Sequence, residues 1–313
     1  MTSSVEGAAT GLPAALTRPK PRRLLHLLGT VALCAVAWIW LITRADLAAL
    51  LTQVAQLPAW AWVLAGAGLL AGHAMRALRL QHEWRHIRRV PWLQCLRIVL
   101  VHNAWVLMLP LRSGEAAYLW AVRQQWGVDW RAAGLALLRW RLQDVAVLLV
   151  LAAALLAPIQ LSLRLLLAAA VAATLGALLR PLWSRLSARA GGPAGLPSGR
   201  GPWSGVGASA ANWSLKVLSN GALLAALAGL SAETGLRAAL GGELAGVQPF
   251  QPPAGLGTYE GGIWLAARLP DAMSSRVVAA ALAVHAFSLA IALGAAALVQ
   301  LLGTQVTIGD SQR

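Results

Sequence analysis

The chain of 313 residues is 58% hydrophobic and only 12% charged, with a formal net charge of +15. Ordinary globular domains are about 25% charged, so this composition excludes a typical soluble protein and indicates an integral membrane protein. A nucleic-acid-binding protein gathers its basic residues on a water-facing surface, whereas here they flank apolar segments, so nucleic acid is not an expected partner.

Apolar windows long enough to be membrane-spanning helices occur along the whole chain. A helix needs about 20 apolar residues to cross a hydrocarbon core of about 30 Å. The windows of this length are 24–43, 58–80, 133–157, 161–180, 208–230 and 276–302. The first has too long an apolar run for a cleavable secretory signal, so we expect it to be retained. We predict an all-α, polytopic membrane helix bundle with about six crossings.

The basic residues predict how this bundle is oriented. Three basic groups stand beside the windows: Arg18, Lys20, Arg22 and Arg23; Arg76, Arg79, Arg85, Arg88 and Arg89; and Arg180, Arg185, Arg189 and Arg200. The positive-inside rule places all three groups in the cytoplasm, and the loops near Arg44, Pro158 and Glu233 outside. The prediction is a multi-pass protein of the cell (inner) membrane with both termini cytoplasmic.

Two further apolar stretches are interrupted by proline and glycine. They read WLQCLRIVLVHNAWVLMLP at 92–110 and LRAALGGELAGVQPFQPPAGLG at 236–257. Proline breaks a helix, and each stretch then continues through glycine into a short apolar helix that contains a glutamate. We therefore predict two re-entrant hairpins. Non-helical backbone inside a membrane is tolerated only where protein or a water-filled cavity supplies its hydrogen bonds, so the hairpins are expected to line a cavity.

The two hairpins align without gaps. PLRSGEAAYLWAVR on GLGTYEGGIWLAAR places Glu115 on Glu260 and Arg123 on Arg268, both pairs 145 residues apart. Each half of the chain then holds three crossings, which inverts the second half relative to the first. Inverted repeats with paired interrupted segments are typical of secondary transporters, which bind substrate near the membrane midplane.

This match predicts the organisation of the chain. The expected segments are a cytoplasmic N-terminal tail at 1–23, a first membrane repeat at 24–157, a second at 158–302, and a C-terminal tail at 303–313. The second repeat includes a stretch at 188–205 that is rich in Gly, Pro and Ser, which predicts a flexible cytoplasmic linker.

Charged residues within apolar segments are the main candidates for function. A glutamate at 115 or 260 that faced lipid would cost several kcal/mol, so both are expected to face the interior. Arg112 could bind a phosphate or carboxylate through its planar fork, or neutralise Glu115. Arg141 and Asp144 share one helix face and can meet, which leaves Arg139 for another partner or for lipid headgroups.

Other polar residues do not indicate catalysis. His73, His102 and His285 are far apart in the sequence and are interpreted as packing residues rather than metal ligands. The sequence contains no Walker A lysine loop, nucleophile elbow or zinc-helix motif, so neither a cofactor nor a metal is expected.

The segments LPLRSGEAAYLW, RWRLQD and PPAGLGTYEG resemble, in order and spacing, the membrane region of lysylphosphatidylglycerol synthases and the stand-alone flippase-like proteins of that superfamily. The resemblance covers about residues 24–302. The matching residues are Pro110, Arg112, Gly114 and Glu115 in the first hairpin, Arg141 and Asp144 in the crossing, and Pro253, Gly255, Gly257 and Glu260 in the second hairpin. Ala254 stands where the family usually has glycine, so we expect a less sharp second turn.

The resemblance implies a lipid flippase or transporter without the aminoacyltransferase domain of the fused enzymes. Arg112 and Arg141 would contact an anionic headgroup, and Glu115 and Glu260 would line the path from opposite leaflets. Its partners would be membrane lipids: a phospholipid, an aminoacyl-lipid or a prenyl-linked headgroup. Two alternatives stay open. The chain could be a lipid-modifying enzyme with Glu115 or Asp144 as general base, or a non-catalytic subunit that holds lipid for an enzyme such as a glycosyltransferase.

Overall fold

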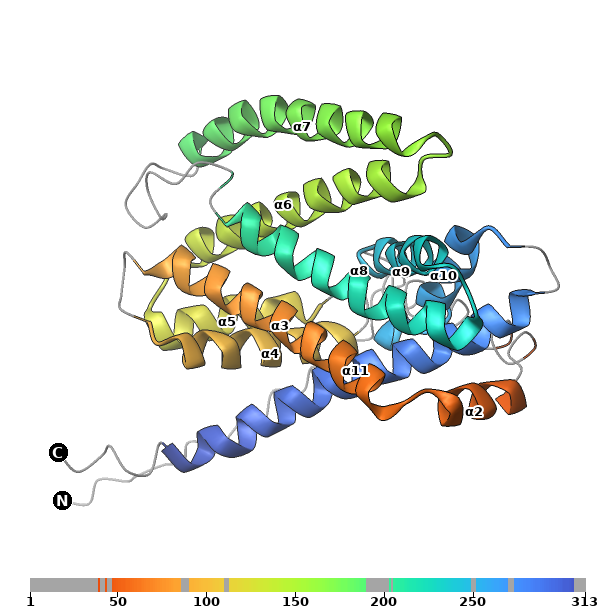
Figure 1. Cartoon of the computed structure of the whole chain (residues 1–313). Helices are drawn as coiled ribbons and strands as arrows, with labels where there is room; N and C mark the ends of the chain where they lie inside the picture. The colour runs from red at the N-terminus through yellow and green to blue at the C-terminus, as the bar shows by residue number, and fades with distance from the viewer. Residues whose placement is uncertain are drawn as a thin grey trace, which may run out of the picture.

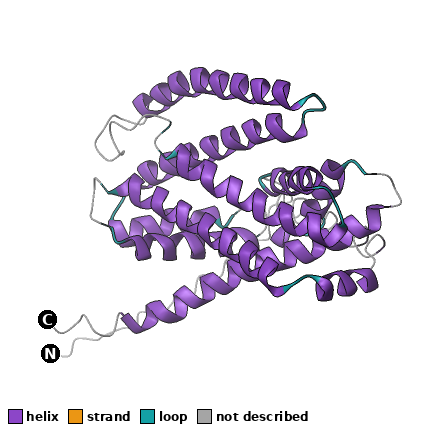
Figure 2. Cartoon of the chain, in the orientation of Figure 1, coloured by secondary structure: helices purple, strands orange, loops and turns teal. Residues whose placement is uncertain are grey.

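The computed structural model describes residues 39, 43, 47–85, 90–109, 113–189, 203, 205–248, 252–269 and 273–306, and within them every regular element is a helix (Figure 2). The elements are α2 (Leu47–Gln56), α3 (Ala59–Trp84), α4 (Trp92–Met108), α5 (Glu115–Trp126), α6 (Trp130–Leu156), α7 (Leu161–Arg189), α8 (Val206–Ala228), α9 (Ala232–Gly246), the 3-10 turn η2 (Pro253–Gly255), α10 (Thr258–Ala267) and α11 (Ser274–Val306). The predicted all-α fold class is confirmed for this part of the chain.

Three of these helices are long and apolar enough to cross a membrane: α3, α7 over Leu161–Leu186, and α11 over Ser275–Leu302. They support a membrane protein, but the predicted count of six crossings is not shown. The windows 133–157 and 208–230 do form the long helices α6 and α8, in which residues such as Arg141, Asp144 and Lys216 lower the mean hydropathy. The window 24–43 lies almost wholly outside the described residues.

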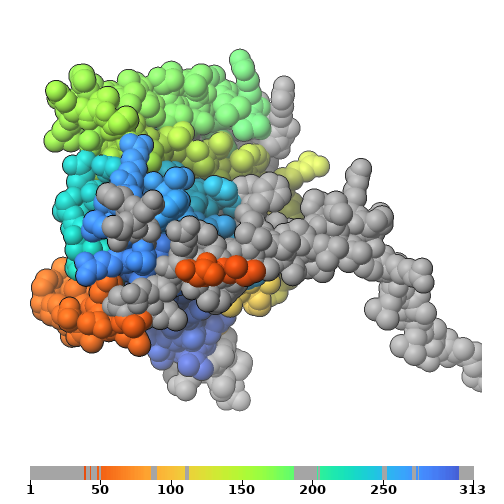
Figure 3. Space-filling model, turned by 90° about the vertical axis from the view of Figure 1, so that its right-hand side faces the viewer, coloured from red at the N-terminus to blue at the C-terminus, as the bar shows by residue number. Residues whose placement is uncertain are grey.

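The long helices α3 and α8 run side by side through the centre of the molecule, and α11 crosses them (Figure 1). The pair α4 and α5 lies on one side, where α4 packs on α3 and α11, and the pair α9 and α10 lies on the other, against α8 and α11. Helix α7 packs on α6, and these two helices form the upper layer of the surface (Figure 3).

An ion pair joins the start of α7 to the start of α9. Arg164 Nη1 lies 2.5 Å from Glu233 Oε1. Glu233 lies in the first turn of α9, before its first buried residue, Gly235. The hydrogen bond from Arg164 and its positive charge lower the pKa of Glu233, so this carboxylate stays ionised at neutral pH. The interaction holds above the ordinary pKa of glutamate and is lost as the pH falls below the lowered value.

Glycines allow the central helices to approach closely. A Cβ atom added at Gly241 of α9 would lie 2.3 Å from the carbonyl oxygen of Gly262 in α10, and one at Gly262 would lie 2.4 Å from the oxygen of Gly241. Gly114 is as tightly placed, because its Cβ would lie 2.3 Å from the backbone of Trp105. Small residues at such contacts are the usual means of packing helices in membranes.

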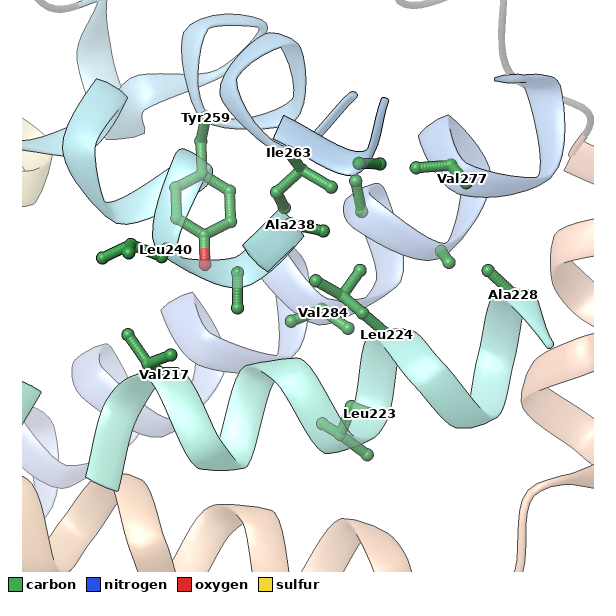
Figure 4. Packing of buried hydrophobic residues seen from close by; sticks show 14 of the residues in the cluster. Val217, Leu223, Leu224, Ala228, Ala238, Leu240, Tyr259, Ile263, Val277 and Val284 are labelled. Carbon is green, nitrogen blue, oxygen red and sulfur yellow. The ribbon is translucent and has the colours of Figure 1, made fainter. Parts of the chain in front are cut away.

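The buried apolar residues form two clusters, each dominated by one half of the chain. One joins α8, α9, α10 and α11, with Leu224, Ile263 and Val284 near its middle (Figure 4). The other joins α3 to α6, around Trp84, Tyr118 and Trp140. Each hairpin is thus anchored in its own core, and the polar residues described below lie between the two.

Candidate functional site

The arginine and aspartate of α6 meet as predicted, and the first hairpin reaches them. Arg141 Nη1 lies 3.8 Å from Asp144 Oδ2, one helical turn away, and Arg141 Nη2 lies 2.9 Å from Glu115 Oε1. Gly114 precedes the first residue of α5 and allows this turn to lie on α4. The other predicted residues of the hairpin, Pro110 and Arg112, lie outside the described residues.

Asp144 joins three helices, which the sequence did not indicate. Arg79 Nη1 on α3 donates to Asp144 Oδ1 at 2.9 Å, and the Ser209 hydroxyl on α8 donates to the same oxygen at 2.5 Å. Arg79 also donates to the backbone oxygen of Trp140 at 3.1 Å. Its side chain is only 3% exposed. Arg79, one of the basic residues that the positive-inside rule grouped together, is thus buried among helices, because α3 continues beyond residue 80 to Trp84.

Arg139 has a carboxylate partner and does not extend to lipid headgroups. It forms a buried ion pair with Glu83 of α3, and Trp140 Nε1 donates to the same glutamate oxygen at 3.4 Å. The guanidinium also lies 5.5 Å from the centre of the Trp183 ring on α7. We call the resulting set the charged layer; its members are Arg79, Glu83, Glu115, Arg139, Arg141 and Asp144.

Glu260 fixes the turn of the second hairpin. Its Oε2 accepts a hydrogen bond from the backbone N–H of Gly257 at 2.7 Å, which caps α10, and its Oε1 lies 2.6 Å from His285 Nδ1 on α11. Glutamate at the third position of a helix commonly caps in this way. His285, interpreted from the sequence as a packing residue, is the hydrogen-bond partner of a predicted site residue.

The second turn remains sharp in spite of its alanine. Ala254 has φ 58°, Gly255 has φ 71° and Gly257 has φ 81°, all in the left-handed region that glycine adopts most easily. Pro253 begins the 3-10 turn before them. The expectation of a less sharp turn was wrong, because Ala254 adopts the left-handed conformation itself.

A second polar cluster, absent from our predictions, joins α8, α9 and α10. Glu243 is 2% exposed and accepts hydrogen bonds from Lys216 Nζ at 2.6 Å, from the Tyr259 hydroxyl at 3.1 Å and from Asn220 Nδ2 at 3.3 Å. Ser288 of α11 donates to Asn220 Oδ1. The sequence did mark Lys216 as unusual, since it is the one charged residue in the apolar window 208–230.

A cavity lies between the two hairpins. It is lined by α3, α6, α8 and α11 near their middles, by the C-terminal end of α4, and by the α9–η2–α10 segment. It holds about 1170 Å³ of empty space out to its open mouth. Its charged lining residues are Arg76, Arg141 and Lys216, with a single carboxylate, Glu243. The three histidines that are far apart in the sequence, His73, His102 and His285, all line it.

The remainder of the lining is apolar or offers hydrogen bonds to a ligand. Leu69, Val106 and Leu289 cover part of the wall. Trp213 Nε1 and His73 Nδ1 are buried and reach no hydrogen-bond partner within the described segments. The described lining is therefore amphipathic, with more basic than acidic side chains, and is suited to an anionic group attached to an apolar one.

The predicted residues contribute to this cavity unequally. Arg141 and Gly255 line it directly. Glu115 and Asp144 contact it only through Arg141, and Glu260 only through His285.

Among the residues described, no group of three or more His, Cys, Asp or Glu side chains is placed to hold a metal ion. No protein-family model matches the chain, and no curated protein matches it significantly.

Proposed function

We propose that the protein is an integral membrane lipid transporter of the flippase type, which moves an amphiphile with an anionic headgroup between leaflets. The observation that supports this most is the cavity between the hairpins. Its lining contains three fixed cations, Arg76, Arg141 and Lys216, against one carboxylate. A ligand pocket commonly combines apolar walls with a few polar groups that set its specificity, and this one would favour a phosphate or carboxylate.

The depth of the cavity also favours transport. Leu69 to Arg76 span the middle of α3, and Trp213 to Lys216 lie near the middle of α8. Secondary transporters bind substrate near the bilayer midplane, at the interface of two repeats whose helices are interrupted. We propose that α4–α5 and α9–α10 are the re-entrant hairpins of two inverted repeats, in an inner-membrane protein with six crossings and cytoplasmic termini.

In this proposal the residues have distinct roles. Arg141 contacts the headgroup while Glu115 and Asp144 hold its guanidinium in place. Glu260 holds the turn and His285 rather than touching the ligand, because it is fully buried behind the cavity wall. The proposed partners are membrane lipids and a lipid-modifying enzyme or glycosyltransferase that supplies the cargo. The resemblance to the lysylphosphatidylglycerol synthase membrane region agrees with these roles.

Lipid exchange in proteoliposomes tests the proposal. Phosphatidylglycerol or phosphatidylcholine with a fluorescent acyl chain is placed in both leaflets, and dithionite bleaches only the outer one. We expect wild-type protein to expose phosphatidylglycerol faster than empty vesicles do. Arg76→Gln should slow exchange about tenfold, because a charge-assisted hydrogen bond contributes about 1.5–3 kcal/mol.

Arg180→Gln is the matched control, since Arg180 is exposed on α7 and does not line the cavity. It should exchange lipid at the wild-type rate. If wild-type protein accelerates neither lipid, or if Arg76→Gln is as fast as wild type, the proposed transport through this cavity is wrong.

A further inference from the structure

A second pocket lies at the end of α3, on the other side of the charged layer from the cavity. Its lining includes Arg79, His82 and Arg85 of α3 together with Gly205, Gly207 and Ala208 at the start of α8. It is open to solvent and holds about 1480 Å³ of empty space out to its mouth. Leu78 and Gln81 also line it from α3, and the lining residues from α8 lack a bulky side chain, so basic groups on one side face nearly bare backbone on the other.

The start of α8 is well formed to bind an anion. The helix begins at Val206, its preceding residue Gly205 has φ 88°, and no side chain caps its first turn. The first N–H groups of a helix lack partners within the helix, and the helix dipole favours negative charge there. Gly207 and Ala208 place this first turn in the pocket wall with almost no side chain to cover it.

Arg79 supplies an independent indication of a ligand. Its side chain is 3% exposed. Its Nη1 donates to Asp144, and its Nη2 donates to the backbone oxygen of Trp140 and to Gln143 Oε1. Its Nε, however, is buried and reaches no hydrogen-bond partner in the part of the chain that the structure describes. A Cβ at Gly205 would lie 3.6 Å from this nitrogen, so the N–H donor lies beside the bare start of α8.

The second pocket and the cavity are connected along one helix. Basic side chains stand at every third residue of α3, in the order His73, Arg76, Arg79, His82 and Arg85. The first two line the cavity and the last three line the second pocket. At the boundary, Asp144 holds Arg79 with one carboxylate oxygen and approaches Arg141 of the cavity with the other.

We propose that the second pocket is a binding site for the phosphate group of a lipid, occupied before or after the cavity. The first turn of α8, Arg79 Nε and the side chains of His82 and Arg85 bind the phosphate oxygens. Asp144 separates this site from the cavity. An anion that displaces the Asp144 carboxylate from Arg79 reaches Arg141 next. The lipid as the source of the phosphate rests on the proposed function, whereas the anion site itself does not.

Titration calorimetry on the full chain in an uncharged detergent tests the site with two probes, inorganic phosphate and dihexanoyl phosphatidylglycerol. The deciding variants are Gly207→Asp and Gly207→Asn, which have the same shape and differ in charge. A side chain fits at this position, since a Cβ at Gly207 meets nothing within 4 Å. An aspartate in the first turn also stabilises a helix, so failure to fold is not the expected outcome.

We expect both probes to bind wild-type protein. Gly207→Asp should weaken binding by about tenfold or more, since the new carboxylate occupies the site and repels the anion. Gly207→Asn should bind within about threefold of wild type. Arg85→Gln should weaken binding by about threefold to tenfold, as removal of an exposed charge does. Arg180→Gln should bind as wild type does.

Three outcomes would overturn the proposal. The first is that neither probe binds, and the second is that Gly207→Asp binds the probes as well as Gly207→Asn does. Either result would show that no anion site exists at the start of α8. Binding of inorganic phosphate without the lipid would contradict a headgroup as the occupant. Because binding is measured without a membrane, a wild-type protein that binds here but exchanges no lipid would refute the proposed function and leave this site intact.

Discussion

Ala254 shows how one residue can hold a conformation at a cost in stability. With φ 58° and ψ 3° it lies in the left-handed region, where an L-residue with a Cβ atom is less stable than glycine by about 1–2 kcal/mol. The turn is retained because Glu260 and the packing of α10 on α9 fix the residues that follow it. The strain is therefore balanced by contacts made elsewhere in the hairpin.

Replacing Ala254 with glycine should stabilise the protein by about 0.5–1 kcal/mol, because relief of strain exceeds the added entropy of the unfolded chain. Thermal unfolding in detergent would show a higher midpoint than wild type. Ala170→Gly is the control: Ala170 is exposed within α7, so the same change should cost about 1 kcal/mol there. A lower midpoint for Ala254→Gly would mean that the turn is not strained.

At this scale the sequence located some contacts and missed others. Arg141 and Asp144 are one helical turn apart, so helix geometry alone predicted their contact. Arg79 and Asp144 are 65 residues apart, and Lys216 and Glu243 are 27 apart. Pairs of this kind depend on which helices pack together, and no local spacing reveals that. The contact of His285 with Glu260, 25 residues away, could not be foreseen for the same reason.

The α9–α10 hairpin shows the same distinction for whole elements. Proline and glycine marked the break at Pro253 and the start of α10 near Glu260, since these residues act on the local backbone. The close approach of the two helices depends on Gly241 and Gly262, whose positions opposite each other only the packed structure reveals. Of the predicted crossings, the apolar α7 and α11 met the expectation best because their sequences contain few polar residues.

The glycines of α10 provide a matched pair of variants. Gly262→Ala should destabilise the protein by about 1–3 kcal/mol, since its Cβ would lie 2.4 Å from the oxygen of Gly241 and would force α10 away from α9. Gly261→Ala adds the same atom where nothing lies within 4 Å, and should be neutral or stabilise α10 by up to about 1 kcal/mol.

Thermal unfolding and lipid exchange of both variants would be measured together. We expect only Gly262→Ala to slow exchange, because α10 positions Tyr259 in the cavity wall. Equal stability of the two variants would show that the close contact is not required for the hairpin.

In the whole molecule, two apolar cores support two hairpins, and the polar groups are concentrated between them. The composition predicted a membrane protein, and the hairpin motifs predicted which segments would face one another. The sequence did not predict that six basic or titratable lining residues from α3, α4, α6, α8 and α11 would share one cavity. That arrangement follows from how the helices cross, with α3 against α8 and α4 against α11.

The charged layer between the cavity and the second pocket contains three arginines and three carboxylates, paired with one another. With all six ionised, the layer has no net charge. An anion that enters it adds an unbalanced negative charge to a poorly solvated region, where charge interactions are strong. Under the proposed function, a monovalent headgroup should therefore cross together with a proton or another monovalent cation, and transport should be electrically silent.

Lipid exchange measured with and without a potassium diffusion potential across the proteoliposomes checks this consequence. We expect the same rate at either polarity, whereas a lipid that moved alone as a monovalent anion would experience about 2.3 kcal/mol per 100 mV. A rate that rises and falls with the sign of the potential would show that the headgroup crosses uncompensated. Silent transport would allow the protein to distribute a charged lipid between leaflets without drawing on the membrane potential.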